Sequence, residues 1–164
     1  LITSSSKDII GIAYLSSFEK VIFKRNQSRM KSIDMLSDGD FIFFKSNVFF
    51  DNEKFLDINL CLDTGSEISS GTSVFYRKVR DRLNHSKLHV ARIETSQGFT
   101  SSFVKFLSNI EFQQGDLNFS LENVPVQTKY SPTSFCDFFL GMDFLYENLI
   151  ELNFEKRTLG IVKN

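Results

Sequence analysis

The amino-acid sequence predicts a mostly-β fold with two short helices. Apolar residues occur mainly in short runs bounded by turn residues, as is typical of β-strands. Phenylalanine, which is enriched in strands, occurs 19 times among the 164 residues. Apolar residues recur at helical spacing in two short segments. A chain of this length forms one compact domain, or one domain with an appendage.

The first two strands are expected at residues 41–50 and 55–63, joined by a polar loop at 51–54. In the second strand, the even-numbered apolar residues share one face by a period of two: Leu56, Ile58, Leu60 and Leu62. Asp63 belongs to the opposite, less apolar face. It lies at the C-terminal end of its strand, where a strand can present a side chain to a site.

The remaining elements follow from the same rules. A helix is expected at Ser73, a candidate N-cap, because apolar residues destined for the core follow at helical spacing: Phe75, Val79 and Leu83. Residues 87–112 predict two strands around a polar tip, and residues 117–130 predict another strand. A second short helix, at about 142–146, precedes a closing strand, a turn at 155–158 and a final strand.

Charge and hydropathy argue against several classes of partner. The 19 basic and 20 acidic residues give a net charge of −1, so we expect no nucleic-acid groove and no polybasic membrane surface. No apolar run is long enough to span a bilayer, and no segment resembles a signal peptide. The sequence therefore leaves the cellular compartment unassigned.

The residues that could bind metal or form disulfides are few. Cys61 and Cys136 are too few for a disulfide framework and fit no zinc spacing, so both are expected to be buried free thiols. His85 and His89 have no cysteine or carboxylate at ligand spacing. We therefore expect neither a metal site nor a cofactor.

Two sequence elements together indicate a chemistry. The triplet Asp63-Thr64-Gly65 follows an apolar strand directly. By itself the triplet is also ordinary turn chemistry, because Asp and Gly both favour turns. The second element is an apolar run that ends at Gly141, 78 residues after Asp63, and a short helix follows it.

In this order and spacing, the two elements resemble those of the retropepsin-like aspartic proteases. The resemblance extends from about Phe41 to Val162, roughly three quarters of the chain. It implies a closed acid-protease barrel lobe with a flap hairpin and two short helices. It also implies that Asp63 is the catalytic residue of an aspartic-type endopeptidase that hydrolyses polypeptides.

The resemblance assigns roles to further residues. Those that support the catalytic loop are Thr64, Gly65 and Ser66. Those that pack beside it are Leu140 and Gly141. Those at the flap tip are Ser96, Gln97, Gly98 and Phe99. Three features depart from the retropepsin pattern: Ser66 follows the triplet where many retropepsins have an alanine, Met142 stands where the retroviral enzymes have an arginine at their dimer interface, and the flap tip has a single glycine.

The implied reaction needs two carboxylates. When they lie about 3 Å apart they cannot both ionise readily, so the pair shares a proton. One carboxylate then acts as general base on a water, and the other as general acid toward the peptide carbonyl. The chain has a single Asp-Thr-Gly. The partner aspartate must therefore come from a second lobe or from a homodimer, and we expect the isolated monomeric lobe to be inactive.

An internal similarity suggests where a second lobe lies. Residues 8–28 align without gaps on residues 138–158, which places Gly11 over Gly141, 130 residues later. In both copies an apolar segment and then a basic turn follow the glycine. We interpret this as the trace of a preceding lobe in the same protein.

The domain prediction follows from this similarity. Residues 39–164 form the protease-like lobe, and residues 1–38 form an N-terminal extension that includes the possible tail of the preceding lobe. The alternatives are a helix and strand that decorate a single lobe, or a segment that swaps onto a partner chain. For function, the alternative to an endopeptidase is an inactive module that uses the fold for dimerisation or for binding an extended peptide.

Overall fold

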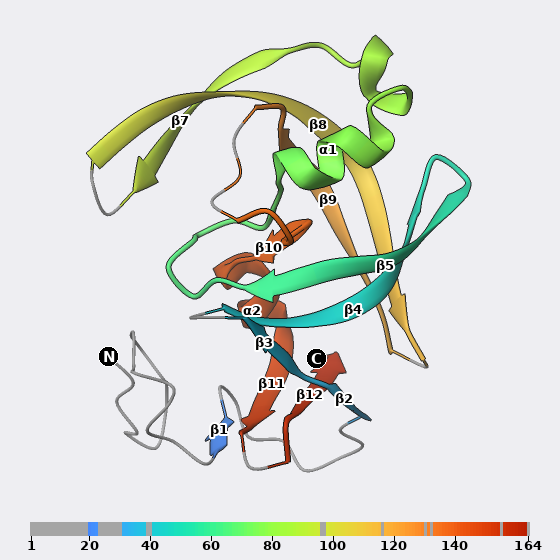
Figure 1. Cartoon of the computed structure of the whole chain (residues 1–164), viewed down its shortest axis with the longest axis vertical. Coiled ribbons are helices and arrows are strands. Elements are labelled where there is room, and N and C mark those ends of the chain that lie inside the picture. Colours follow the sequence, from blue (N-terminus) through green and yellow to red (C-terminus); the bar gives the residue numbers. More distant parts are fainter. Residues whose placement is uncertain are drawn as a thin grey trace.

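The computed structural model describes residues 20–22, 31–38, 41–95, 98–115, 117–129, 131, 133–154 and 156–163. Two β-sheets dominate these residues, and the helices are short (Figure 1). The mostly-β class that the sequence predicts is therefore confirmed, as are the two short helices.

The larger sheet has the strand order β3-β4-β5-β10-β6-β9-β8-β7. Its strands are β3 (Leu36–Asp38), β4 (Phe41–Phe50), β5 (Glu53–Leu62), β6 (Ser70–Gly71), β7 (His89–Thr95), β8 (Gly98–Gln114), β9 (Leu117–Gln127) and β10 (Phe138–Leu140). An additional antiparallel pairing joins β4 to β8 and places Val48 opposite Phe112. This pairing closes six strands, from β4 to β8, into a barrel, and a closed barrel has no free edge.

The smaller sheet lies at one end of the barrel and has the order β1-β11-β12-β2 (Figure 1). Its strands are β1 (Lys20–Ile22), β2 (Lys31–Asp34), β11 (Asn148–Asn153) and β12 (Thr158–Lys163). The hairpin β11–β12 forms its centre, with β1 on one side and β2 on the other. Strands β1, β2 and β3 all fall within the predicted extension at 1–38, and each pairs with a strand of the lobe.

Among the described residues, the helices are α1 (Ser73–Val79), the 3₁₀ turn η2 (Arg82–His85) and α2 (Met142–Glu147). The N-cap prediction for α1 is wrong by one residue. Thr72 occupies the cap, where its hydroxyl accepts the Val74 N–H at 3.1 Å, and Ser73 is already helical. Thr72 is held at the cap because its hydroxyl also donates a 2.6 Å hydrogen bond to the carbonyl oxygen of Cys136. Sequence spacing does not reveal this contact.

The first hairpin turn is tighter than the predicted loop at 51–54. Asp51 and Asn52 both have positive φ angles, 52° and 61°, and they form a two-residue turn between β4 and β5. A two-residue turn of this kind matches the right-handed twist of the strands, and Asp and Asn tolerate its left-handed backbone. Glu53 and Lys54 therefore already belong to β5.

A bulge in β5 interrupts the predicted period of two. The register runs from Ser46 opposite Ile58 to Val48 opposite Phe55, and Asp57 adopts a positive φ of 54°. Two residues of β5 therefore oppose one residue of β4 at this point. The strand resumes its alternation after the bulge, with Ile58 and Leu60 fully buried.

The core fills the barrel and extends under the smaller sheet. Its largest fully buried side chains are Phe44, Phe75, Phe112, Phe138, Phe144, Ile58, Leu60, Leu83, Leu107, Ile110 and Leu140. The predicted core residues of the first helix are confirmed, since all three are at most 1% exposed. Leu83 reaches the core from η2 rather than from α1, because α1 ends at Val79.

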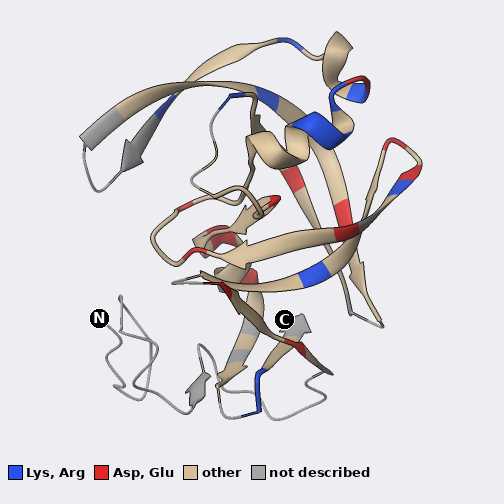
Figure 2. Ribbon diagram, viewed as in Figure 1, with Lys and Arg blue, Asp and Glu red and all other residues tan. Residues whose placement is uncertain are grey.

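Charges of both signs are spread over the described part of the chain (Figure 2). Basic residues concentrate on α1 and η2, at Arg77, Lys78, Arg80 and Arg82. Two of them have acidic partners: Lys78 pairs with Asp137, and Arg82 pairs with Glu53. Within the described residues, none of the helices has the length and apolar character needed to cross a bilayer.

Candidate active site

Asp63 lies directly after β5, at the start of a loop that runs to Ser69. The pairing of β5 with β10 is parallel and places Leu62 opposite Leu140. The backbone N–H of Asp63 donates a 2.9 Å hydrogen bond to the carbonyl oxygen of Leu140. The backbone of Asp63 is thereby fixed against the strand that ends just before Gly141, and its side chain is half-buried.

The loop after Asp63 is closed by its own hydrogen bonds. Oδ1 of Asp63 accepts the N–H of Gly65 at 3.0 Å, and the carbonyl of Asp63 accepts the N–H of Ser66 at 3.2 Å. The hydroxyl of Ser66 donates to the carbonyl of Ile68 at 2.8 Å. The first of these contacts is an Asx-turn. The triplet is thus a turn and still presents a partly accessible carboxylate.

Gly141 packs directly against the backbone of this loop. A β-carbon at Gly141 would lie 2.7 Å from the carbonyl carbon of Ile68 and 2.9 Å from the carbonyl oxygen of Ser66. Helix α2 begins at the next residue, and its first N–H groups bind the same loop. The backbone N–H of Met142 donates to the carbonyl oxygen of Ser66 at 2.8 Å, and the backbone N–H of Asp143 donates to the carbonyl oxygen of Glu67 at 3.1 Å. Helix N–H groups that lack intrahelical partners therefore anchor the loop.

Asp143 ties α2 to the end of the loop. Its carboxylate accepts the Ser69 hydroxyl at 2.6 Å and the Ser69 backbone N–H at 2.9 and 2.8 Å. The Ser69 hydroxyl in turn accepts the N–H of Gly141 at 2.9 Å. Ser69 is only 2% exposed, so these hydrogen bonds are shielded from water. Sequence reasoning did not find this pair, because 74 residues separate its members. The available signal was an acidic residue in the first turn of a helix.

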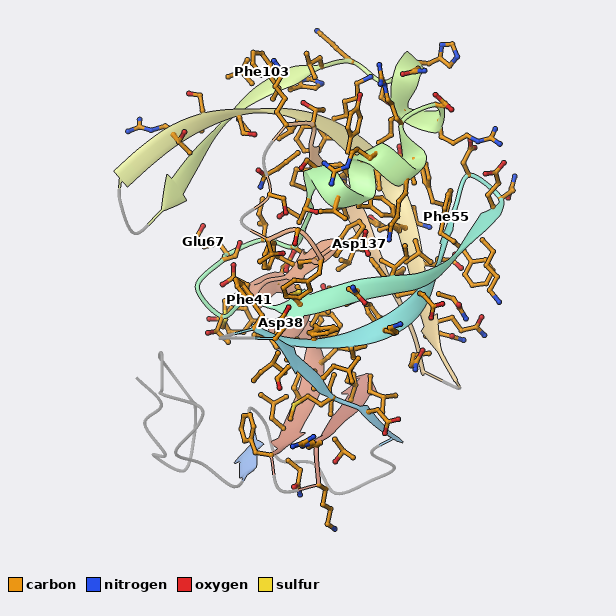
Figure 3. All side chains as sticks on the ribbon, in the orientation of Figure 1. Asp38, Phe41, Phe55, Glu67, Phe103 and Asp137 are labelled. Atoms are coloured by element: carbon orange, nitrogen blue, oxygen red, sulfur yellow. The ribbon has the colours of Figure 1, made fainter. Side chains whose placement is uncertain are left out.

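A second buried carboxylate supports the strands beneath the site. Asp137 immediately precedes β10, and its side chain is 1% exposed (Figure 3). Its Oδ2 accepts the backbone N–H of Asn59 at 3.0 Å and the Lys78 ammonium at 2.8 Å. Its backbone N–H donates to the Asn59 carbonyl, and its carbonyl accepts the Thr72 N–H. Asp137 therefore joins β5, α1 and the start of β10.

The two cysteines are free and buried, as the sequence predicts. They form a small apolar cluster with Phe139, separate from the main core. The Cys136 thiol donates to the Phe138 carbonyl at 3.0 Å. Burial, together with hydrogen bonding to Cys61, raises the pKa of the Cys136 thiol far above its usual range. Cys136 is therefore a neutral packing residue rather than a nucleophile.

The hairpin β7–β8 extends beyond the barrel on the same side as the loop after β5 (Figure 1). The register pairs Thr95 with Gly98 and Glu94 with Phe99 at its tip. Ser96 and Gln97, which the sequence assigns to the flap tip, lie outside the described residues, as does the side chain of Phe99. The hairpin itself is present where the sequence predicts two strands.

Two further residues of the loop have exposed side chains: Glu67, which is labelled in Figure 3, and Ile68, which is 55% exposed. A pocket of about 310 Å³ lies elsewhere, between β4, β8 and β9, and its lining includes Phe49, Glu111 and Phe119. None of its lining residues belongs to the loop at 63–69, so we do not assign it to the site.

Across the described chain, no three His, Cys, Asp or Glu side chains gather closely enough to hold a metal ion.

Comparison with known structures identifies the architecture. The chain is similar in structure to a retropepsin-like aspartic protease from Rickettsia conorii, with a TM-score of 0.50 and 17% sequence identity. The match covers 81% of this chain and 91% of that protein chain. No family model matches the sequence, and no curated protein matches it. The likeness shows that the chain has the retropepsin-like fold.

Proposed function

We propose that this chain is one lobe of an aspartic-type endopeptidase and that Asp63 is one of its two catalytic carboxylates. The observation that carries the proposal is the anchoring of Asp63. Its backbone is bonded to Leu140, and the loop that follows it is bonded to α2 through Ser66 and Ser69. General acid–base catalysis requires a carboxylate held in a fixed orientation, and two separate elements supply that support here.

The chemistry requires a partner carboxylate close to Asp63. The two groups share one proton, because two like charges at short distance do not both ionise. The ionised group takes a proton from a bound water, which attacks the peptide carbonyl, and the protonated group donates a hydrogen bond to that carbonyl oxygen. The titration then belongs to the pair and not to either aspartate. Thr64 and Gly65 hold the turn, and the partner aspartate comes from a second lobe or a second chain.

We assign unfolded or extended polypeptides as the substrate class. The β7–β8 hairpin, with its tip at 96–99, acts as the flap that covers the substrate and excludes water. The hairpin extends on the same side of the barrel as the loop at 63–69 (Figure 1), which supports this assignment. A single lobe offers one Asp-Thr-Gly, so the isolated monomer binds peptide weakly at best and does not cleave it.

The test is hydrolysis of an unfolded protein at mildly acidic pH by the full-length protein that contains this lobe and its partner. Asp63→Asn should lower the hydrolysis rate by about 10²–10⁴-fold, because the amide cannot exchange a proton with water or substrate. The matched control is Asp57→Asn, an exposed aspartate on β5, the strand that leads into Asp63, and it should leave the rate unchanged. An Asp63→Asn protein that hydrolyses as fast as the original would refute the proposal.

Titration calorimetry separates the enzyme from an inactive peptide-binding module. Heat of peptide binding without any cleavage by the unmodified full-length protein would favour the module. Cleavage that disappears in Asp63→Asn while peptide binding persists would favour the enzyme. For the chain alone, we expect no cleavage at any concentration at which sedimentation shows a monomer.

A further inference from the structure

Strand β7 forms one end of the larger sheet. In the strand order it pairs with β8 alone, and it lies outside the six strands that close the barrel. Its residues, His89–Thr95, pair with β8 in a continuous register without a bulge. Among the described residues, no strand pairs with the outer edge of β7. An edge strand of this kind presents backbone N–H and C=O groups that can pair with another chain.

The hydrogen bonds of Thr128 show which residues of β7 face that edge. The backbone N–H and the hydroxyl of Thr128, which follows β9, both donate to the carbonyl oxygen of Phe103, at 2.9 and 3.1 Å. The carbonyl of Phe103 therefore points toward β9 and away from β7. In an antiparallel pair, such a residue exchanges no hydrogen bonds with the residue opposite it, whose N–H and C=O also point outward. Val90 lies opposite Phe103, so its N–H and C=O are directed to the outer edge of β7.

The side chains on this part of the hairpin are apolar and basic. Val90 and Phe103 share one face of the hairpin, because they lie opposite each other, and they are 68% and 41% exposed. Arg92 lies on the same face by alternation, and its side chain is exposed. The Lys129 ammonium lies 4.9 Å from the centroid of the Phe103 ring. Leu88, just before the strand, is 50% exposed. This part of the hairpin therefore combines exposed apolar surface with positive charge.

Positive charge also surrounds the start of β7. Between positions 77 and 92 the sequence has six Lys and Arg residues and one acidic residue, although the net charge of the whole chain is −1. Figure 2 shows this concentration of basic residues on α1, η2 and β7. Acidic partners neutralise Lys78 and Arg82. A segment that binds along β7 is therefore favoured when it is acidic.

We propose that the outer edge of β7 binds an extended, acidic segment of a partner protein by strand addition, antiparallel to β7. Antiparallel pairing is the more stable arrangement per residue. An acidic side chain of the segment lies opposite Arg92, and an apolar side chain two residues later lies opposite Val90, because side chains alternate along a strand. The segment therefore reads acidic, any residue, apolar from its N-terminus. The proposal goes beyond the endopeptidase assignment and makes no use of Asp63.

A second copy of this chain fits the same edge less well. The antiparallel register that pairs every residue of β7 with β7 of a second copy is centred on Arg92, the middle residue of the strand. This register places Arg92 opposite itself, and like charges directly opposite each other destabilise a sheet. An acidic segment replaces that repulsion with an attraction.

The test measures the binding of two synthetic peptides to the isotope-labelled full chain by nuclear magnetic resonance. The acidic peptide is Thr-Glu-Thr-Val-Thr-Val-Thr, and lysine replaces the glutamate in the control peptide. The acidic peptide should shift the backbone amide resonances of residues 87–93 and slow hydrogen exchange at the Val90 N–H. The N–H of Ala91 points toward β8, so its exchange should be slow with and without peptide. The lysine peptide should bind several-fold more weakly.

Two substitutions test the edge itself. Val90→Pro removes an N–H that is not part of the ladder with β8, so the hairpin should persist while binding of the acidic peptide weakens by about five-fold. The matched control, Val90→Ile, keeps the N–H and the apolar side chain and should bind as the unmodified chain does. Arg92→Glu should reverse the preference, so that the lysine peptide binds more tightly than the acidic peptide. This reversal tests the proposal even if the circular dichroism melting curve shows that Val90→Pro does not fold.

Four results would overturn the proposal. The first is equal binding of the two peptides, or a preference that Arg92→Glu leaves unchanged. The second is a set of peptide-induced shifts confined to the loop at 63–69, which would place the peptide in the candidate active site. The third is a dimer of the unmodified chain that Val90→Pro dissociates in sedimentation, which would make a second copy the occupant. The fourth is the absence of binding by the acidic peptide at millimolar concentration. These readouts measure association only, so they are independent of whether Asp63 is catalytic.

Discussion

Gly141 lies against the backbone of Ile68 so closely that a β-carbon at position 141 would be 2.7 Å from the Ile68 carbonyl carbon and 2.8 Å from its oxygen. Both atoms are backbone, so neither can rotate away as a side chain would. The loop that begins at Asp63 and the strand that ends at Leu140 therefore meet through a contact that only glycine permits.

Gly141→Ala should destabilise the chain by about 1–3 kcal/mol, the usual cost of forcing extra volume into a packed site. The free energy of unfolding from urea titration measures this cost. The control is Gly115→Asn, since Gly115 has a positive φ of 58° and no atom within 4 Å of a built β-carbon. Asn tolerates this backbone conformation, so the control should change stability by less than about 0.5 kcal/mol. Equal effects at the two glycines would contradict the packing argument.

The Asp143 carboxylate should contribute to stability through Ser69. Asp143→Ala removes a charged acceptor of shielded hydrogen bonds and should cost about 1.5–3 kcal/mol. Asp143→Asn keeps one acceptor oxygen and should recover part of that loss. Asp81→Ala serves as the control, because Asp81 is exposed and makes no capping hydrogen bond. The free energy of unfolding of the three variants is measured by urea titration. An Asp143→Ala chain as stable as Asp81→Ala would contradict the role given to the Asp143 carboxylate.

The ion pair between Lys78 and Asp137 should matter more than an exposed pair. Lys78→Met leaves the Asp137 carboxylate, 1% exposed, without its cation. Because the Lys78 side chain is 40% exposed and water screens the pair, we expect a loss of about 2 kcal/mol, below the 3–5 kcal/mol of a fully buried pair.

The control is the exposed ion pair of Lys45 and Asp57, in which Lys45 Nζ lies 3.9 Å from Asp57 Oδ1. Lys45→Met should cost less than about 0.5 kcal/mol. Adding Asp137→Asn to Lys78→Met should restore part of the loss, since the uncompensated charge is then gone. Thermal or urea unfolding of these variants measures each step. If both lysine substitutions had the same effect, the role given to Asp137 would be wrong.

The chain should become less stable in alkali because of Cys136. Its thiol stays protonated in the folded state, because burial raises its pKa. In the unfolded state the thiol ionises near pH 8.5, so the unfolded state binds fewer protons at higher pH and is favoured. Stability that is fully present below about pH 8.5 is therefore lost progressively above it.

Between pH 7.5 and 9.5 this one group should account for a loss of about 1.4 kcal/mol. The measurement is the urea midpoint of the unmodified chain and of Cys136→Ala at both pH values. The unmodified chain should lose more stability than the variant over this interval. Parallel losses in both proteins would show that other groups cause the pH dependence.

Several features could be predicted from the sequence because they depend on neighbours in the chain. The β-strands follow from alternating and apolar runs, and the position of Asp63 at a strand end follows from the turn residues after it. The first hairpin turn was missed in detail, because Asp51 and Asn52 adopt left-handed backbone conformations that also suit longer loops. The cap of α1 was missed by one residue, because the choice between Thr72 and Ser73 depends on a carbonyl 64 residues away.

By itself, the sequence determined the mostly-β class, the strand that delivers Asp63 and the two short helices, because periodicity and turn residues act over a few positions. Only the tertiary structure decided which distant groups meet: Asp63 with Leu140, Ser69 with Asp143, and Val21 with Leu152. The physical reason is that barrel closure and strand register join segments 74 to 131 residues apart, and the energy of these contacts depends on the whole packed chain.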